Sequence, residues 1–326
     1  MRLLTRADFD GLACGALLEY LGIVNEWEFV HPTDVQNGFV HATENDVVAN
    51  IPYIKGCKIW FDHHSSEIER LGKAFFEERK LPPDPEGSIY PGYTQWEVIK
   101  VSWNAPSCAR VIYDYYREQM PEAGLERFEE MVGNVDKVDS GSLSEEEVLN
   151  PAGWVLLGFI MDPRTGLGRF GNFTITNVEL VGLLAQACVN MDITQILSLC
   201  DVRERIDLYF QQDKLFREMI RRHSAVEGNV LIIDLRKVDP IYTGNRFLPY
   251  ILFPDQNISV TVIESANPAQ CTLAVGRSTV NKSAAVDVGS LMLAYKGGGH
   301  KNVGTCQVPR DEADRVLQDL VRACKG

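Results

Sequence analysis

The sequence lacks the features by which membrane proteins and disulfide-rich proteins are recognised. It has no run of about 18 apolar residues, and the N-terminus MRLLTRADFDG reaches an acidic cluster early, so we expect neither a membrane span nor a signal peptide. Its eight cysteines are scattered and form no CxxC pair, which argues against a structural zinc site and favours reduced thiols. We therefore expect a soluble, cytoplasmic protein.

Positive charge is also scarce. The chain has 32 Lys and Arg against 45 Asp and Glu, a net charge of −13, which argues against a broad basic surface for long nucleic acid. A short anionic substrate, held by a metal ion and a few cationic side chains, is compatible with this balance. The length of 326 residues predicts two domains, and no internal repeat is visible.

Strand-like and helix-like segments alternate in the first part of the chain. RLLT, WEFVHP, DVVANI and CKIWF have the apolar, β-branched or aromatic character of strands, whereas GLACGALLEYLG and SCARVIYDYYREQM have helical spacing. This alternation predicts a parallel sheet with helices on its faces. The segment 76–98, rich in proline, glycine and aromatic residues, is expected to be a surface loop.

The second part of the chain has a different texture. A helical apolar stripe near residues 201–225 predicts a connecting helix, and strand-like segments such as ISVTVIES and CTLAVGRS follow it. We thus expect an α/β protein of two domains: residues 1–200 with a parallel sheet, and residues 226–326 forming a smaller α/β domain with a mixed sheet.

Acidic and histidine side chains follow the predicted strands. Asp8 and Asp10 come after RLLT, and Asp62, His63 and His64 come at the end of CKIWF. Ligands of parallel sheets bind beyond the carboxyl ends of the strands. The alternative for Asp8 and Asp10 is a role in helix capping. Carboxylates beside an imidazole suit manganese, iron, cobalt or zinc, and we expect Mn²⁺.

The C-terminal part contains a glycine-rich segment, AYKGGGHKNVG. Glycines allow the backbone to approach an anion closely, although a triplet can also be a helix stop. In the nearby GRST segment, Arg277 has a guanidinium suited to a phosphate, and Ser278 can donate a further hydrogen bond.

Taken in order, DFDG, FDHHSS, VDKVDSG, VGRS and GGGHKNVG resemble the motifs of the DHH phosphoesterase superfamily with its DHH-associated C-terminal domain. The resemblance covers nearly the whole chain and is nearest to the oligoribonuclease, nucleotide phosphatase and exopolyphosphatase-like branch. It implies that residues 1–200 form the metal-binding phosphoesterase domain and that residues 226–326 form the substrate-binding domain.

The resemblance also implies roles for individual residues. Asp8 and Asp10 would be metal ligands, and Asp10 would bind the better-held ion together with His63. Asp62 would orient the site, and His64 would face the scissile phosphate. The acidic ligand of VDKVDSG would be Asp136 as first choice and Asp139 as second. In the C-terminal domain the substrate would be bound by Arg277, Ser278, Gly298, Gly299 and His300, with Arg277 and His300 also stabilising the transition state.

Two positions depart from the family pattern. Leu4 stands where the family has a histidine, and the third-strand position of a metal-bridging aspartate is Asn50. The resemblance therefore implies one well-held Mn²⁺, with Mg²⁺ or Co²⁺ as alternatives, and leaves a second ion open. The candidates that could compensate are Asp34, Asp46, His41 and Arg6.

The expected activity is metal-assisted hydrolysis of a phosphate ester. The substrate would be a small nucleotide or a short single-stranded oligonucleotide, with no membrane partner and a homodimer as a possible assembly. The alternative is a nucleotide- or phosphate-binding protein of the same fold whose metal chemistry has weakened.

Overall fold

The computed structural model describes residues 1–78, 92–93, 98–170 and 172–325. Most of the segment 76–98, predicted as a surface loop, lies outside these residues. The chain divides into two compact units. Unit 1 contains Met1–Ser142, Pro151–Pro163 and Leu167–Asp207, and unit 2 contains Leu143–Asn150, Arg164–Gly166 and Leu208–Gly326.

Unit 1 is built on a sheet with the strand order β2-β1-β3-β4-β6-β5. Its strands are β1 (Arg2–Thr5), β2 (Glu26–Phe29), β3 (Asp46–Ala49), β4 (Ile59–Asp62), β5 (Gly92–Tyr93) and β6 (Val98–Val101). All neighbouring pairs are parallel except β5 with β6. The predicted parallel sheet is confirmed. Because β2 and β3 lie on opposite sides of β1, the connections diverge there, and such a point opens a crevice at the carboxyl ends of the strands.

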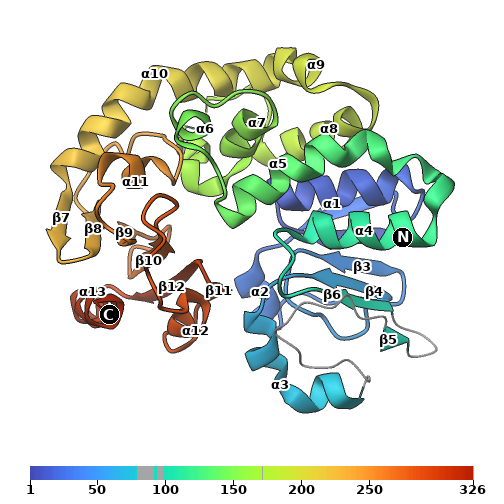
Figure 1. The fold of residues 1–326 in the computed structure, drawn as a ribbon, viewed down its shortest axis with the longest axis horizontal. Coiled ribbons are helices and arrows are strands. Elements are labelled where there is room, and N and C mark those ends of the chain that lie inside the picture. Colours follow the sequence, from blue (N-terminus) through green and yellow to red (C-terminus); the bar gives the residue numbers. More distant parts are fainter. Residues whose placement is uncertain (79–91, 94–97, 171, 326) are drawn as a thin grey trace. The chain divides into compact units, whose positions relative to one another are not determined.

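The two faces of this sheet are covered by different helices (Figure 1). Alternate strand residues point to opposite faces, so Leu4, Val48 and Trp60 join one apolar cluster together with Phe76 of α3 (Ser66–Glu78). On the other face Phe61 packs against two tyrosines of α4 (Cys108–Gln119). Complete burial of such side chains stabilises the unit by about 1.5–3 kcal/mol each.

Helix α1 (Phe9–Tyr20) is the central helix of unit 1. Ten of its twelve residues are buried, and it packs against α4, α5 and α8. A helix that is apolar on all sides must lie inside the protein, so its N-terminus is held firmly at the sheet edge. The other helices that begin in this unit are α2 (Pro32–Gln36), α5 (Glu129–Ser140), α7 (Gly153–Met161), α8 (Asn177–Asn190), α9 (Ile193–Ser198) and α10 (Cys200–Arg222), with short 3-10 turns at Pro121–Ala123, Leu125–Phe128, Pro163–Thr165 and Leu167–Arg169.

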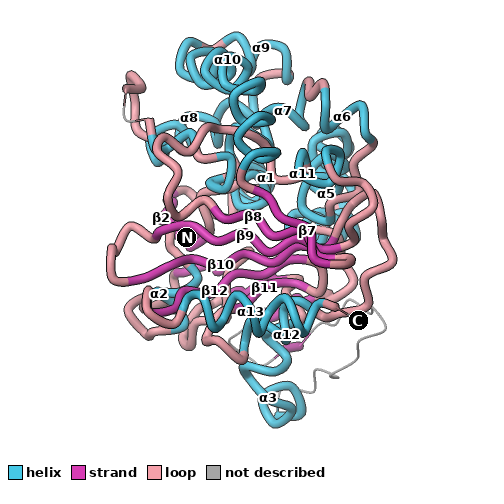
Figure 2. Tube along the Cα trace, turned by 90° about the vertical axis from the view of Figure 1, so that its left-hand side faces the viewer, coloured by secondary structure: helices cyan, strands magenta, loops and turns pink. Residues whose placement is uncertain are grey.

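Unit 2 contains a second sheet, with the order β11-β12-β10-β9-β8-β7 (Figure 2). Strands β8 and β9 are parallel and the remaining pairs are antiparallel, so the predicted mixed sheet is confirmed. The predicted connecting helix corresponds to α10, within which the chain passes from unit 1 to unit 2. The strands are β7 (Ser224–Glu227), β8 (Val230–Asp234), β9 (Ile258–Glu264), β10 (Gln270–Arg277), β11 (Gly298–His300) and β12 (Val303–Pro309).

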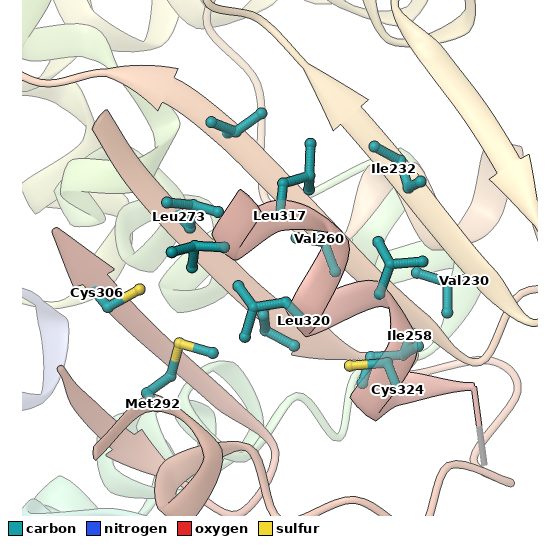
Figure 3. Close-up of a cluster of buried hydrophobic side chains, with 14 of the residues drawn as sticks. Val230, Ile232, Ile258, Val260, Leu273, Met292, Cys306, Leu317, Leu320 and Cys324 are labelled. Atoms are coloured by element: carbon teal, nitrogen blue, oxygen red, sulfur yellow. The ribbon is translucent and has the colours of Figure 1, made fainter. Parts of the chain in front are cut away.

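The core of unit 2 lies between this sheet and α13 (Ala313–Cys324). Figure 3 shows Leu317 and Leu320 of α13 among side chains of the central strands, including Val260 and Leu273. The smaller helices of the unit are α6 (Glu145–Leu149), α11 (Leu248–Leu252) and α12 (Val288–Leu293). Among the described residues, no helix is both long enough and apolar enough to span a membrane.

Candidate metal centre and active site

The predicted site residues of unit 1 gather where three parallel strands end. Asp8 follows β1, Asn50 follows β3, and Asp62 is the last residue of β4. This is the edge at which the connections diverge around β1, the position where ligands bind in open α/β sheets.

Asp10 is held at this edge by two helices. It lies in the first turn of α1, and its buried carboxylate accepts the backbone N–H groups of Cys108 at 2.9 Å and Ala109 at 2.8 Å, at the start of α4. Burial raises the pKa of Asp10 well above its usual value, with a further rise from the charges of Asp139 and Asp8, while the two N–H donors oppose it. A bound cation would relieve this excess of negative charge.

His63 is oriented by a backbone carbonyl. Its Nδ1 donates to the carbonyl oxygen of Ala105 at 3.2 Å, because a carbonyl can only accept. The neutral ring then has its lone pair on Nε2, which lies 3.6 Å from Oδ2 of Asp10 and 3.3 Å from Oδ2 of Asp139. Metal-binding histidines are fixed in this way, with the other ring nitrogen donating to a carbonyl or carboxylate.

Asp139 completes a group of three. Ligand atoms of Asp10, His63 and Asp139 all lie within 4.8 Å of one another. Asp139 is in the last turn of α5, where the helix dipole disfavours a negative charge. Two carboxylate oxygens and one imidazole nitrogen are suitable ligands for a divalent cation such as manganese, iron, cobalt or zinc. The three side chains could therefore hold a divalent metal ion.

Asp136 makes different contacts. Its Oδ1 accepts a hydrogen bond from Ser107 Oγ at 2.6 Å, and its Oδ2 accepts from Nε of Arg110 at 2.9 Å. Ser107 is the N-cap of α4, so Asp136 links the start of α4 to α5. Of the two aspartates considered from the sequence, the second choice, Asp139, is the one beside Asp10 and His63.

Asp8 lies beside this group but is engaged with other partners. Its Oδ1 accepts from the backbone N–H of Gly11 and from Nδ2 of Asn50, each at 3.0 Å, and its Oδ2 lies 3.1 Å from Nε of Arg6. Asn50 thus acts as a hydrogen-bond donor to Asp8. Leu4 is fully buried among the apolar residues of the sheet.

Of the residues considered as substitutes for missing ligands, Asp46 lies at the first residue of β3, at the opposite end of that strand from Asn50. Its carboxylate binds Nε of Arg2 at 2.8 Å and also accepts the backbone N–H of Thr43. Asp34 lies in the first turn of α2, and His41 is an exposed residue that precedes β3.

Asp62 and His64 form a close pair. Oδ1 of Asp62 lies 2.6 Å from Nδ1 of His64, and Oδ2 of Asp62 is buried without a hydrogen-bond partner among the described residues. Burial raises the pKa of Asp62 to about 7, and burial together with the neighbouring His63 lowers the pKa of His64 to about 3. Near neutral pH His64 is therefore uncharged, and it can take part in hydrogen bonding and proton transfer.

The chain is similar to proteins of known structure. No family model matches the sequence, and no curated protein matches it in sequence comparison. Among solved structures, a pGpG-specific phosphodiesterase, PggH from Vibrio cholerae, is 38% identical, covers 98% of this chain and 97% of its own, and superposes with a TM-score of 0.71. The chain belongs to the DHH phosphoesterase family. It is thus a hydrolase.

Another member of this structural group is more distant in sequence. An exopolyphosphatase-related protein from Bacteroides fragilis is 12% identical over 99% of this chain and 92% of its own, with a TM-score of 0.50. This likeness is one of fold.

In unit 2 of the DHH phosphoesterase, the predicted substrate residues lie at neighbouring strand ends. Arg277 ends β10, and its backbone N–H donates to Asn302 at 2.8 Å, in the turn between β11 and β12. The guanidinium of Arg277 also donates to the carbonyl of Ala284, and Ser278 Oγ accepts N–H groups of the following turn. The backbone thereby brings Arg277 and Ser278 close to the segment Gly298–His300.

The glycines of that segment have a packing role. Gly298 and Gly299 belong to β11, and Gly299 has a φ of 151°, where a Cβ would lie 2.2 Å from the carbonyl oxygen of Val303. The close hairpin of β11 and β12 therefore requires glycine at this position. His300 ends β11 and pairs with Val303 across the hairpin.

Three contributors to the site were missed from the sequence. The carbonyl of Ala105, which orients His63, gives no sequence signal, because any residue supplies a carbonyl. The backbone N–H groups of Cys108 and Ala109, which hold Asp10, could have been inferred, since the predicted start of α4 exposes such donors.

Proposed function

We propose that this DHH phosphoesterase is a manganese-dependent phosphodiesterase of short nucleotides, and that linear dinucleotides such as pGpG are its substrates. The observation that carries the proposal is the convergence of Asp10, His63 and Asp139, whose ligand atoms lie within 4.8 Å of one another. The likeness to a pGpG-specific phosphodiesterase over nearly the whole chain supports this substrate class.

In this proposal Asp10, His63 and Asp139 hold the cation. When bound, a divalent cation lowers the pKa of a water ligand and polarises a phosphoryl oxygen. The Nδ1 proton of His63 is donated to the carbonyl of Ala105, so Nε2 is the ring nitrogen that faces the cation. The amides of Cys108 and Ala109 keep the Asp10 carboxylate oriented.

In this proposal His64 and Asp62 supply a proton to the leaving oxygen of the substrate. The 2.6 Å contact between Asp62 Oδ1 and His64 Nδ1 holds one shared proton near neutral pH. His64 can donate a hydrogen bond to the leaving oxygen of the scissile phosphate. A side chain that readily shares its proton can act as a general acid in this step. Asp62 orients the ring, and its raised pKa, about 7, matches the working range of a proton donor.

The parts of the chain would have different roles, as their sequence motifs suggest. Residues 1–200 would form the metal-binding domain, 201–225 the connecting helix and 226–326 the substrate-binding domain. Arg277 and His300 would neutralise charge on the substrate, with Ser278, Gly298 and Gly299 as further contacts. The planar guanidinium of Arg277 suits a phosphate. A cytoplasmic location is consistent with eight free cysteines, seven of them buried.

The proposal is tested by incubating the protein with Mn²⁺ and pGpG and measuring GMP release by chromatography. Cyclic dinucleotides, 3′-phosphoadenosine 5′-phosphate, longer oligonucleotides and polyphosphate serve as competing substrates. Asp10→Ala and His63→Ala should abolish release, and Asp207→Ala, an exposed carboxylate of α10, should not.

Bound Mn²⁺ with no hydrolysis of any of these substrates would favour the alternative, a nucleotide-binding protein. Full activity in Asp10→Ala would refute the assigned metal site.

A further inference from the structure

A fixed positive charge lies next to the candidate metal centre. Arg6 follows β1, and its Nε forms an ion pair of 3.1 Å with Oδ2 of Asp8. Its side chain is 32% exposed, and among the described residues its only ion pair is the one with Asp8. The rest of the guanidinium is therefore available to a ligand that enters from solvent.

Both carboxylate oxygens of Asp8 are already engaged by donors. The backbone N–H of Gly11 and the amide of Asn50 occupy Oδ1, and Arg6 occupies Oδ2. For Asp8 to bind a cation, it would have to give up the charge of Arg6, which would then be left beside that cation. This arrangement disfavours a divalent ion at Asp8.

Asn50 is held in place for this contact. Its φ of 59° is in the left-handed region, which asparagine tolerates better than most residues, and its backbone N–H donates to Phe61 at 3.2 Å. Unusual backbone of this kind is frequent at functional sites. The amide also donates to Asp8, so Asn50 fixes the carboxylate that in turn fixes Arg6.

Arg6 lies at the same edge of the sheet as the candidate metal ligands. Its ion-pair partner Asp8 is the N-cap of α1 and comes two residues before Asp10 of the triad. The guanidinium is therefore held beside the centre at which the phosphate is proposed to bind.

We propose that this enzyme binds a single divalent cation and that the Arg6 guanidinium, positioned by Asp8 and Asn50, stands in the place of a second cation and binds a non-bridging oxygen of the substrate phosphate. The inference rests on the proposed function for the identity of the metal triad. A guanidinium pairs with two phosphate oxygens in a fixed geometry, and its positive charge is permanent, so it does not depend on the concentration of a metal ion.

The first test counts metal ions. Wild-type protein, freed of metal and titrated with Mn²⁺ by calorimetry, should bind one ion per chain, and elemental analysis after gel filtration should agree. Two ions per chain, or none, would overturn the inference. Two ions together with hydrolysis of pGpG would leave the proposed function standing, whereas one ion without hydrolysis of any substrate would refute that function alone.

The second test removes the guanidinium. In Arg6→Ala the affinity for GMP, used as the probe of phosphate binding, should fall at least about tenfold, and kcat/KM for pGpG should fall on the order of 100-fold. The Mn²⁺ count should stay at one. Arg6→Lys should recover part of the loss, and millimolar guanidinium should restore part of the activity of Arg6→Ala.

The matched control is Arg203→Ala, which removes an arginine that is 65% exposed and paired with Asp207 on α10. It should leave GMP binding and hydrolysis unchanged. Unchanged GMP affinity in Arg6→Ala would overturn the phosphate-binding role. Melting curves of both variants show whether a loss reflects unfolding instead, and the guanidinium rescue identifies a missing charge, which a purely structural role would not produce.

Discussion

Replacing one aspartate of α5 at a time separates metal binding from structural support. Asp139→Asn removes a carboxylate from the triad, whereas Asp136→Asn removes the partner of Ser107 and Arg110. Both changes keep the size of the side chain and remove one negative charge. The two residues are three positions apart on one helix, so helix propensity and overall charge are matched.

The metal affinities should diverge strongly. Loss of a residue that merely supports a metal ligand weakens binding about 10- to 100-fold, so loss of the ligand itself in Asp139→Asn should cost at least about 100-fold. That factor corresponds to about 2.7 kcal/mol. Asp136→Asn should change the affinity for Mn²⁺ much less, because its carboxylate is turned toward α4. Calorimetric titration with Mn²⁺ measures both.

The stabilities without metal should move in opposite directions. Asp139→Asn removes repulsion with Asp10 and a charge at a helix C-terminus, worth about 0.3–1 kcal/mol, so Tm should rise by roughly 1–4 °C. Asp136→Asn weakens charged hydrogen bonds worth about 1.5–3 kcal/mol, so Tm should fall by roughly 3–10 °C. Tight Mn²⁺ binding by Asp139→Asn, or its loss in Asp136→Asn, would refute the reasoning.

Four further outcomes are expected. Because burial raises the pKa of Asp10, its protonated form persists to higher pH than that of an ordinary aspartate, so Mn²⁺ affinity should fall on acidification well before the pH reaches the roughly 3.9 at which an ordinary aspartate protonates; a constant affinity in calorimetry would contradict this. Thiol titration of the native protein should show one rapidly reacting cysteine, Cys200, since the other seven are buried, and several fast thiols would be inconsistent with the packing. Gly11→Ala should lower stability by about 1–3 kcal/mol, because a Cβ would lie 2.1 Å from the carbonyl oxygen of Arg6. Gly182→Ala in α8, where a Cβ meets no other atom, should raise it by about 0.4–1 kcal/mol in the same denaturation assay.

Two short secondary-structure elements were not predicted from the sequence, for physical reasons. The segment LSEEEVL, residues 143–149, contains the short helix α6, whose start has the reciprocal hydrogen bonds of Ser144 and Glu147. The serine and glutamate spacing was readable, but five residues are too few for periodicity to show. Strand β11 was also missed, because its glycines carry no apolar pattern and its pairing with β12 is a long-range contact.

The choice between Asp136 and Asp139 as the metal ligand could not be made from local sequence pattern. Both residues lie on one side of α5, three apart, and both are acidic, so neither spacing nor composition separates them. What separates them is contact with other segments: Arg110 of α4 lies beside Asp136, whereas His63 after β4 lies beside Asp139.

The sequence by itself determined the alternation of strands and helices and the positions of acids and histidines at strand ends, because side-chain periodicity and strand termini are local properties. Only the tertiary structure decided which of these groups meet. It brought Asp10, His63 and Asp139 together, and it engaged Asp8 with Arg6 and Asn50. These choices depend on strand order and helix packing, which join residues far apart in the chain and leave no trace in the spacing of neighbours.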